Sequence, residues 1–192
     1  MTLYLVRHGR AEAGIEQLDP GLDEVGKSQA ERAALALRGV GAKRLICSPL
    51  RRARETAAPI AAMLALTPEI RGEVAEVFDP AMGVGARRDM LIPLLSGKWS
   101  EQPAELVSWR DRVLSALVGL GTEDAIVVSH FVAISAAIGA STEDDRVSPC
   151  ALANASITTM VVVGGKLALR RPGEVSHLSP DEITATHAAL RR

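Results

Sequence analysis

The chain has 192 residues, of which 47% are hydrophobic, so it is long enough to bury one sizeable core, and we expect a single domain over residues 1–192. Lys and Arg number 22 against 23 Asp and Glu, and a formal charge of -1 excludes a global basic field of the kind that binds nucleic acid. Two cysteines argue against a disulfide framework, and no apolar run is long enough to cross a bilayer, so we expect a cytoplasmic protein without membrane partners.

Short β-rich runs alternate along the chain with Ala- and Leu-rich amphipathic segments. This alternation is typical of a largely parallel sheet with helices on both faces. Gly164-Gly165 joins the last two strands and is suited to a tight hairpin, so that pair is expected to be antiparallel. The predicted fold class is α/β, a three-layer sandwich with a doubly wound, mostly parallel sheet and an antiparallel edge strand. The predicted strands are residues 3–6, 44–48, 125–129, 157–163 and 166–171.

Helix start signals place four helices between these strands. Asp23 is suited to cap the first helix. Pro49 fits the first turn of the second helix, with Ser48 placed to cap it. Residues 76–99 are punctuated by Pro and Gly and are weakly periodic, so we interpret them as an excursion over the edge of the sheet. The predicted helices are residues 23–38, 49–66, 103–117 and 130–138.

Each of the first three clear strands runs directly into polar residues. The first leads into Arg7, His8 and Gly9, which together offer an anion clamp, a nucleophile or base, and a flexible backbone. The second leads into residues 48–56, which open a helix whose free amide groups and positive dipole end favour an anion. The third leads into His130. In a parallel sheet these groups gather at the edge where open α/β sheets bind ligands, so the sequence predicts a local phosphate site.

Five segments, in order along the chain, resemble those of the histidine phosphatase superfamily, which includes phosphoglycerate mutases and several kinds of phosphatase. The resemblance spans about residues 2–163, and five ordered motifs are far more specific than any one of them. The matching segments are 5–9 (LVRHG), 22–30 (LDEVGKSQA), 48–57 (SPLRRARETA), 127–130 (VVSH) and 154–158 (NASIT).

The resemblance implies a covalent mechanism. His8 would attack the phosphorus in line, and water would then hydrolyse the phosphohistidine intermediate. Arg7 and Arg52 would chelate the phosphoryl oxygens, and His130 would add a further hydrogen-bond donor. Because arginines and histidines supply the charge stabilisation, we predict no metal and no cofactor.

The proton donor of the family is a Glu or Asp after the second helix. Glu76 stands at the matching position. Its apolar neighbours would raise its pKa toward neutrality, as general-acid catalysis requires. Glu73 and Asp79 are the neighbouring alternatives.

Three further arginines are candidates for binding the substrate. Arg10 follows the signature where the family often has Glu, and it either adds positive charge at the mouth of the site or lies on the surface. Arg87 and Arg88 belong to the excursion and either contact the nonreacting end of a substrate or face the solvent, which is the commoner arrangement. Phe131 stands where the family commonly has Gly, so the pocket wall is expected to be bulkier.

The sequence therefore favours hydrolysis of a phosphomonoester, with a small phosphorylated substrate or a phosphoprotein as partner. The enzyme alternative is phosphoryl transfer of the phosphoglycerate mutase type, which needs a lid that excludes water. Only about fifty residues separate Glu76 from the third strand, and one predicted helix there belongs to the core, so little chain remains for a lid. A noncatalytic phospholigand-binding module is the other alternative. The sequence predicts no particular oligomeric state.

Overall fold

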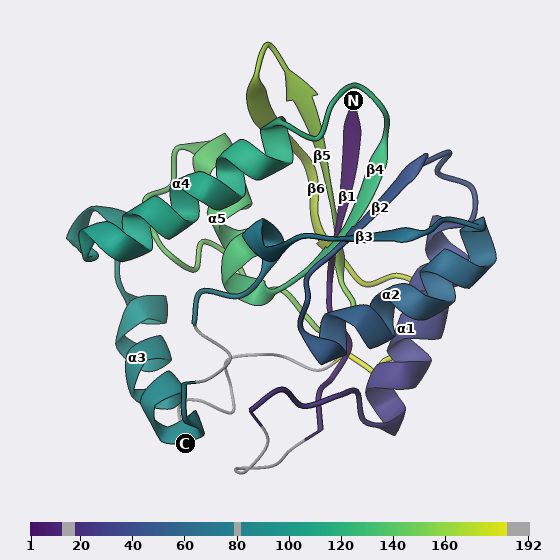
Figure 1. The fold of residues 1–192 in the computed structure, drawn as a ribbon, viewed down its shortest axis with the longest axis horizontal. Helices are drawn as coiled ribbons and strands as arrows, with labels where there is room; N and C mark the ends of the chain where they lie inside the picture. The colour runs from purple at the N-terminus through teal and green to yellow at the C-terminus, as the bar shows by residue number, and fades with distance from the viewer. Residues whose placement is uncertain (13–17, 79–81, 184–192) are drawn as a thin grey trace.

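Residues 1–12, 18–78 and 82–183 are described by the computed structural model, and within them one six-stranded sheet carries helices on both faces (Figure 1). The strand order is β3-β2-β4-β1-β5-β6. The strands are β1 (Thr2–Arg7), β2 (Arg44–Cys47), β3 (Pro68–Ile70), β4 (Ala125–Ser129), β5 (Ile157–Val163) and β6 (Lys166–Glu174).

The strands β3, β2, β4 and β1 run in one direction, and the direction reverses between β1 and β5 and again at the hairpin between β5 and β6. β1 and β2 both pair in parallel with β4, and β3 pairs in parallel with β2. β5 is antiparallel to β1, and β6 is antiparallel to β5. The predicted α/β class, the mostly parallel sheet and the antiparallel hairpin are confirmed. The sheet reverses one strand earlier than expected, and the three-residue β3 was not predicted because it is too short to show a period of two.

The helix starts differ in part from the expectation. Asp23 caps α1 as predicted, since its side chain accepts a hydrogen bond from the Gly26 amide at 2.8 Å. The prediction that Pro49 opens α2 is wrong, because Ser48 Oγ accepts from the Leu50 amide at 3.3 Å and turns the chain before the helix begins. The helices are α1 (Glu24–Leu37), α2 (Arg51–Leu64), α3 (Val84–Ser96), α4 (Ala104–Val118) and α5 (Phe131–Thr142), with short 3-10 helices at Gly72–Val74 and Trp99–Glu101.

The stretch 76–99, interpreted from the sequence as an irregular excursion, contains the helix α3. Its apolar residues fall in one run around Pro93 instead of recurring at helical spacing, so the pattern does not indicate a helix. Figure 1 shows α3 at the lower left, on the side of the sheet toward which β1, β2 and β4 run. The excursion therefore brings a helix to the side of the sheet where the phosphate site is expected.

Both faces of the sheet are buried, and this explains why its central strands are continuously apolar. Leu45 and Cys47 of β2 pack into the core that includes residues of α1 and α2, whereas Ile46 packs into the core that includes residues of α4 and α5. Figure 1 shows α1 and α2 together on one side of the sheet and α4 and α5 on the other. Packing on both faces holds the strand ends in place, and with them the polar residues that follow. Among the helices of the described ranges, none combines the length and the apolar character that a membrane span needs.

Candidate active site

Three strand ends meet at one edge of the sheet. Arg7 at the end of β1 lies opposite Ser129 at the end of β4, and Cys47 at the end of β2 lies opposite Val128. The backbone amide of His8 then donates to the Ser129 carbonyl at 3.0 Å. The parallel register thus places the polar residues that follow β1, β2 and β4 side by side, as the sequence predicts.

The ring of His8 is held in one tautomer by two hydrogen bonds. Nδ1 lies 2.7 Å from the carbonyl oxygen of Gly9, so Nδ1 carries the proton and donates it. Arg52 Nε donates to the other ring nitrogen, Nε2, at 3.2 Å, which requires a lone pair there. Burial, followed by the positive charges of Arg52 and Arg7, holds the pKa of His8 well below its usual range. His8 is therefore neutral at physiological pH, with a lone pair on Nε2.

The turn that carries His8 packs directly against the first turn of α1. A Cβ atom on Gly9 would lie 2.5 Å from the carbonyl oxygen of Gly26, and a Cβ atom on Gly26 would collide with the carbonyl oxygen of Arg10. Thr56 adds a further contact, because its hydroxyl accepts from the Gly9 amide at 3.0 Å. Glycine at both positions allows this close approach of two backbones.

Two buried arginines flank His8. Arg7, at the end of β1, donates to the Leu152 carbonyl at 2.6 Å, and its guanidinium lies over the ring of Phe131 at 5.5 Å. Arg52 lies in the first turn of α2. Burial lowers the pKa of both, that of Arg7 to about 10, while the negative charge of Glu76 opposes the shift. Both guanidinium groups stay charged at neutral pH, so this part of the site attracts an anion.

Asp19 supplies a carboxylate at the start of α2 that sequence reasoning missed. Both of its side-chain oxygens accept from the Arg51 amide at 3.0 Å, so it satisfies a free donor of the first helical turn. One of these oxygens also lies 3.7 Å from Nη1 of Arg52. Asp19 precedes α2 by some thirty positions in an unpatterned loop, so no local signal indicates this contact.

His130 follows β4 and is completely buried. Its Nε2 lies 2.7 Å from Ser48 Oγ, and its ring centroid lies 5.1 Å from that of His8. Burial, then the positive charge of Arg52, holds the pKa of His130 well below its usual range, so the ring is neutral. Among the described residues, Nδ1 of His130 has no hydrogen-bond partner. Ser48 was expected only to cap α2, and its contact with His130 was not predicted.

Glu76 lies in the connection after the first 3-10 helix and is 9% exposed. Its carboxylate accepts from the amides of Val77 at 3.0 Å and Val132 at 3.4 Å. Burial raises the pKa of Glu76, and these hydrogen bonds and the nearby arginine charges only partly oppose the shift. Of the two alternatives, Glu73 is exposed and Asp79 lies outside the described residues. Of the two acids that the structure describes, Glu76 is the one hydrogen-bonded to the start of α5.

The three additional arginine candidates separate into different environments. Arg10 forms an ion pair with Asp23, with 2.5 Å between Nε and Oδ2, so its guanidinium ties the turn that carries His8 to the cap of α1. Arg87 is 8% exposed, its guanidinium lies 5.0 Å from the ring centroid of Phe78, and its positive charge lowers the pKa of Arg52. Arg88 is exposed on the same helix. Of the α3 pair, Arg87 is therefore the one whose charge acts on Arg52.

Two further residues hold the backbone carbonyl of His8. Asn154 Nδ2 and the Ala155 amide both donate to the His8 carbonyl at 3.2 Å, although the sequence assigned neither residue a role beyond a matching motif.

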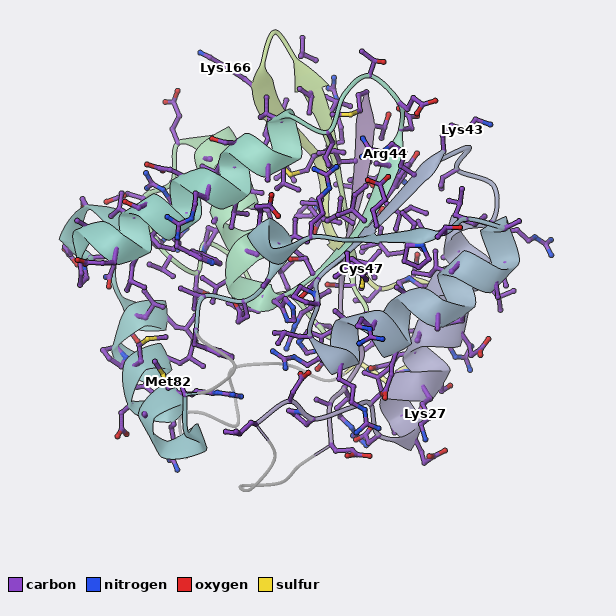
Figure 2. The ribbon with its side chains drawn as sticks, viewed as in Figure 1. Lys27, Lys43, Arg44, Cys47, Met82 and Lys166 are labelled. Carbon is purple, nitrogen blue, oxygen red and sulfur yellow. The ribbon has the colours of Figure 1, made fainter. Side chains whose placement is uncertain are left out.

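Cys47, labelled in Figure 2, is buried at the end of β2, and burial raises its thiol pKa to about 12, so the thiol is unreactive. No group of three His, Cys, Asp or Glu side chains within the described ranges is arranged to hold a metal ion.

Residues 3–174 match the sequence model of the Histidine phosphatase superfamily (branch 1). Bacillus stearothermophilus YhfR shares 23% identity and a TM-score of 0.75, over 92% of this chain and 98% of that one. A mutant phosphoserine phosphatase from Entamoeba histolytica, solved with phosphoserine, shares 22% identity and a TM-score of 0.75, over 93% of this chain and 99% of that one.

A mycobacterial glucosyl-3-phosphoglycerate phosphatase is also similar, with 20% identity and a TM-score of 0.70 over 91% of this chain and 99% of that one. At these identities the likeness concerns the fold. No curated protein sequence matches the chain at a significant level.

Proposed function

Because the chain belongs to the histidine phosphatase superfamily, we propose that it is a phosphatase that hydrolyses phosphomonoesters through a phosphohistidine intermediate on His8. One observation carries this proposal: Nε2 of His8 bears a lone pair beside the Arg52 guanidinium, and the ring is neutral. A neutral imidazole with a fixed tautomer next to two buried cations has the properties of a nucleophile for a bound phosphate.

In the first half of the reaction, the phosphoryl group lies between Arg7 and Arg52, which offset its negative charge. His8 Nε2 forms a bond to phosphorus as the bond to the ester oxygen breaks. Glu76, whose protonated form is favoured because burial raises its pKa, donates its proton to the leaving oxygen. The alcohol leaves and the phosphohistidine remains.

In the second half, Glu76 is ionised and accepts a proton from water. The water oxygen attacks phosphorus, the bond to His8 Nε2 breaks, and inorganic phosphate leaves. His130 assists both halves in this proposal. Ser48 has a single hydroxyl proton, and donating it to His130 Nε2 places the proton of the imidazole on Nδ1, from which it can be donated to a phosphoryl oxygen.

For the substrate, we propose a small phosphorylated molecule whose nonreacting end carries a second anionic group. Arg87 supports this proposal, since it is a buried cation within electrostatic reach of Arg52. The phosphatases of similar fold that are named for phosphoserine and glucosyl-3-phosphoglycerate act on molecules of this chemical type. A buried Arg87 favours a small substrate over a phosphoprotein.

The test is release of phosphate from an aryl phosphate, with labelling of His8 from a radioactively labelled phosphate ester in the same preparation, quenched in alkali because the P–N bond of phosphohistidine is labile in acid. We expect the wild-type protein to turn over and His8→Ala to lose at least about 10³-fold in kcat. Circular dichroism of His8→Ala serves as the control for folding. No release by the wild type, or undiminished release by His8→Ala, contradicts the proposal. A phosphoryl group that passes to an added alcohol in preference to water would indicate a mutase instead.

A further inference from the structure

The peptide unit between Gly9 and Arg10 is hydrogen-bonded at both ends. Its carbonyl oxygen, on Gly9, accepts from Nδ1 of His8 at 2.7 Å. Its amide, on Arg10, donates to Oε1 of Gln29 at 2.7 Å. A trans peptide is planar, with its C=O and N–H pointing in opposite directions, so a partner that holds the N–H also aims the C=O. Gln29 thus controls the direction of the oxygen that receives the His8 proton.

Gln29 is itself held from the other side. It lies on α1 with no exposed surface, and its Nε2 donates to the backbone oxygen of Glu182 at 2.6 Å. One neighbour is an N–H and the other is a C=O, and this fixes which end of the amide is oxygen and which is nitrogen. The amide side chain can satisfy both neighbours in one orientation only.

Glu182 is fixed in turn by its carboxylate. It accepts from Ser28 Oγ at 2.5 Å and from Ser179 Oγ at 2.7 Å, and it lies 2.7 Å from Nε of Arg32. Ser28 and Arg32 belong to α1, so the C-terminal segment 176–183 is fastened to the same helix that carries Gln29. The backbone oxygen of Glu182 is therefore a stationary acceptor.

The same segment supports the catalytic turn from a second direction. His177 is half-buried, and its Nε2 lies 3.0 Å from the Ala155 carbonyl oxygen. The Ala155 amide donates to the His8 carbonyl at 3.2 Å. The C-terminal segment thus contacts partners of the His8 turn on two sides.

We propose that Gln29 is a positioning residue for His8, and that segment 176–183 anchors it. The hydrogen bonds form a chain from the Glu182 backbone oxygen, through the Gln29 amide and the Gly9–Arg10 peptide, to Nδ1 of His8. Holding the proton on Nδ1 keeps the lone pair on Nε2, the atom proposed to attack phosphorus. The consequence for catalysis rests on the proposed function, whereas the consequence for the tautomer does not.

The test replaces Gln29 by Leu, which has a similar volume and no amide. We expect ¹⁵N NMR of the ring nitrogens of His8 to change from Nδ1-protonated to a mixture of the two tautomers. With an aryl phosphate, kcat should fall about tenfold while KM changes little, because Arg52 still favours the correct tautomer. Glu31→Leu, an exposed position on the same helix, is the matched control and should leave both measurements unchanged.

A folded Gln29→Leu variant with an unchanged His8 tautomer overturns the proposal, even if kcat falls, because the effect would then be merely structural. If Gln29→Leu does not fold, Gln29→Glu replaces it: this variant keeps the acceptor for the Arg10 amide and loses the donor to Glu182. It should give a smaller tautomer change of the same kind, and an unchanged tautomer overturns the proposal equally. If the wild type releases no phosphate, the proposed function fails while the NMR comparison still decides the role of Gln29.

Discussion

Nε of Arg52 donates a hydrogen bond to Nε2 of His8 at 3.2 Å, so a proposed phosphate-binding residue is hydrogen-bonded to the proposed nucleophile. This contact has two effects. It requires an unprotonated Nε2, and the adjacent positive charge lowers the pKa of the imidazole. Arg52 therefore acts on the protonation state of the proposed nucleophile, in addition to its proposed contact with the phosphate.

Replacing Arg52 by Lys tests the importance of guanidinium geometry. Lysine keeps the charge but has neither the Nε donor nor the planar fork. We expect kcat/KM for an aryl phosphate to fall about 10²-fold or more. Arg54→Lys, at an exposed position of the same helix, is the control and should remain close to the wild type. Wild-type activity in Arg52→Lys would show that charge alone suffices.

The pH dependence of activity should reflect Glu76. As a general acid it must be protonated, so kcat/KM falls as pH rises through its raised pKa. On the acid side, His8 stays neutral until the pH is well below the usual histidine range, because its pKa is lowered. Glu76→Gln should lower kcat and remove the alkaline limb, whereas Glu73→Gln, at an exposed position, should keep it. A limb that persists in Glu76→Gln would exclude Glu76 as the acid.

The carboxyl group of Glu76 should also lower the free energy of unfolding at neutral pH. A group whose pKa is raised on folding contributes its full stability below its unfolded pKa, about 4.3 for Glu, and loses it as pH rises through the folded pKa. Glu76→Gln should therefore have a higher Tm than the wild type at about pH 8 and a similar Tm at about pH 4. Thermal unfolding at both pH values measures this. Equal stabilisation at both would point to packing instead of ionisation.

The contact between Ser48 and His130 should matter for catalysis as a unit. Ser48→Ala removes the hydrogen-bond partner of His130 Nε2, so the ring loses the contact that in the proposed mechanism places its proton on Nδ1. We expect kcat to fall about tenfold, the effect of one well-placed hydrogen bond. A double-mutant cycle with His130→Ala should show strong coupling, because Ser48→Ala should add little once the ring is gone. Additive effects would mean that the two side chains act independently.

Arg87 and Arg88 form a matched pair for testing the recognition of a second anion. Arg87 is buried near the clamp and Arg88 is exposed on the same helix. Arg87→Ala should raise KM about tenfold or more for a phosphorylated carboxylic acid such as phosphoserine, and much less for an aryl phosphate. Arg88→Ala should change neither value. Equal effects of Arg87→Ala on both substrates would contradict a role in specificity.

The close contact between α1 and the turn that carries His8 should make the stability of the protein sensitive to a side chain at Gly26. Gly26→Ala places a methyl group against the Arg10 carbonyl, so the free energy of unfolding should fall by about 1–3 kcal/mol. Gly85→Ala, in α3, meets no atom within 4 Å and should stabilise the protein slightly, since alanine is the better helix former. Chemical denaturation of both variants measures the contrast. A stable Gly26→Ala would show that the turn can move away without cost.

Much of the fold can be predicted from the sequence because local patterns indicate many of its strands, turns and helix ends. The apolar runs of β1, β4 and β5, the glycine pair before β6 and the capping residue Asp23 each act over a few positions. Elements without such a pattern escape prediction. β3 is three residues long, and α3 presents its apolar residues in one run, so the local sequence indicates neither element. Contacts with the elements they pack against determine their structure instead.

For the site, the sequence by itself determined which residues stand at the strand ends: Arg7 and His8 at the end of β1, Arg52 in α2 and His130 after β4. These residue types directly follow buried strands, or open the helix after one, and parallel strands end at a common edge. Each local motif therefore also indicates where its residues lie, namely at the common edge of the sheet.

The tertiary structure alone decided the state and the supports of that chemistry. It buried Arg87 and left Arg88 exposed, and it placed Asp19 beside Arg52. It also joined Gln29 to Glu182 by a hydrogen bond across 153 positions of sequence. Such contacts depend on how layers pack and how buried each group becomes, and burial also sets the tautomers and pKa values. No pattern in a neighbouring stretch of chain encodes them, because the two partners come together only when the sheet and its helices are assembled.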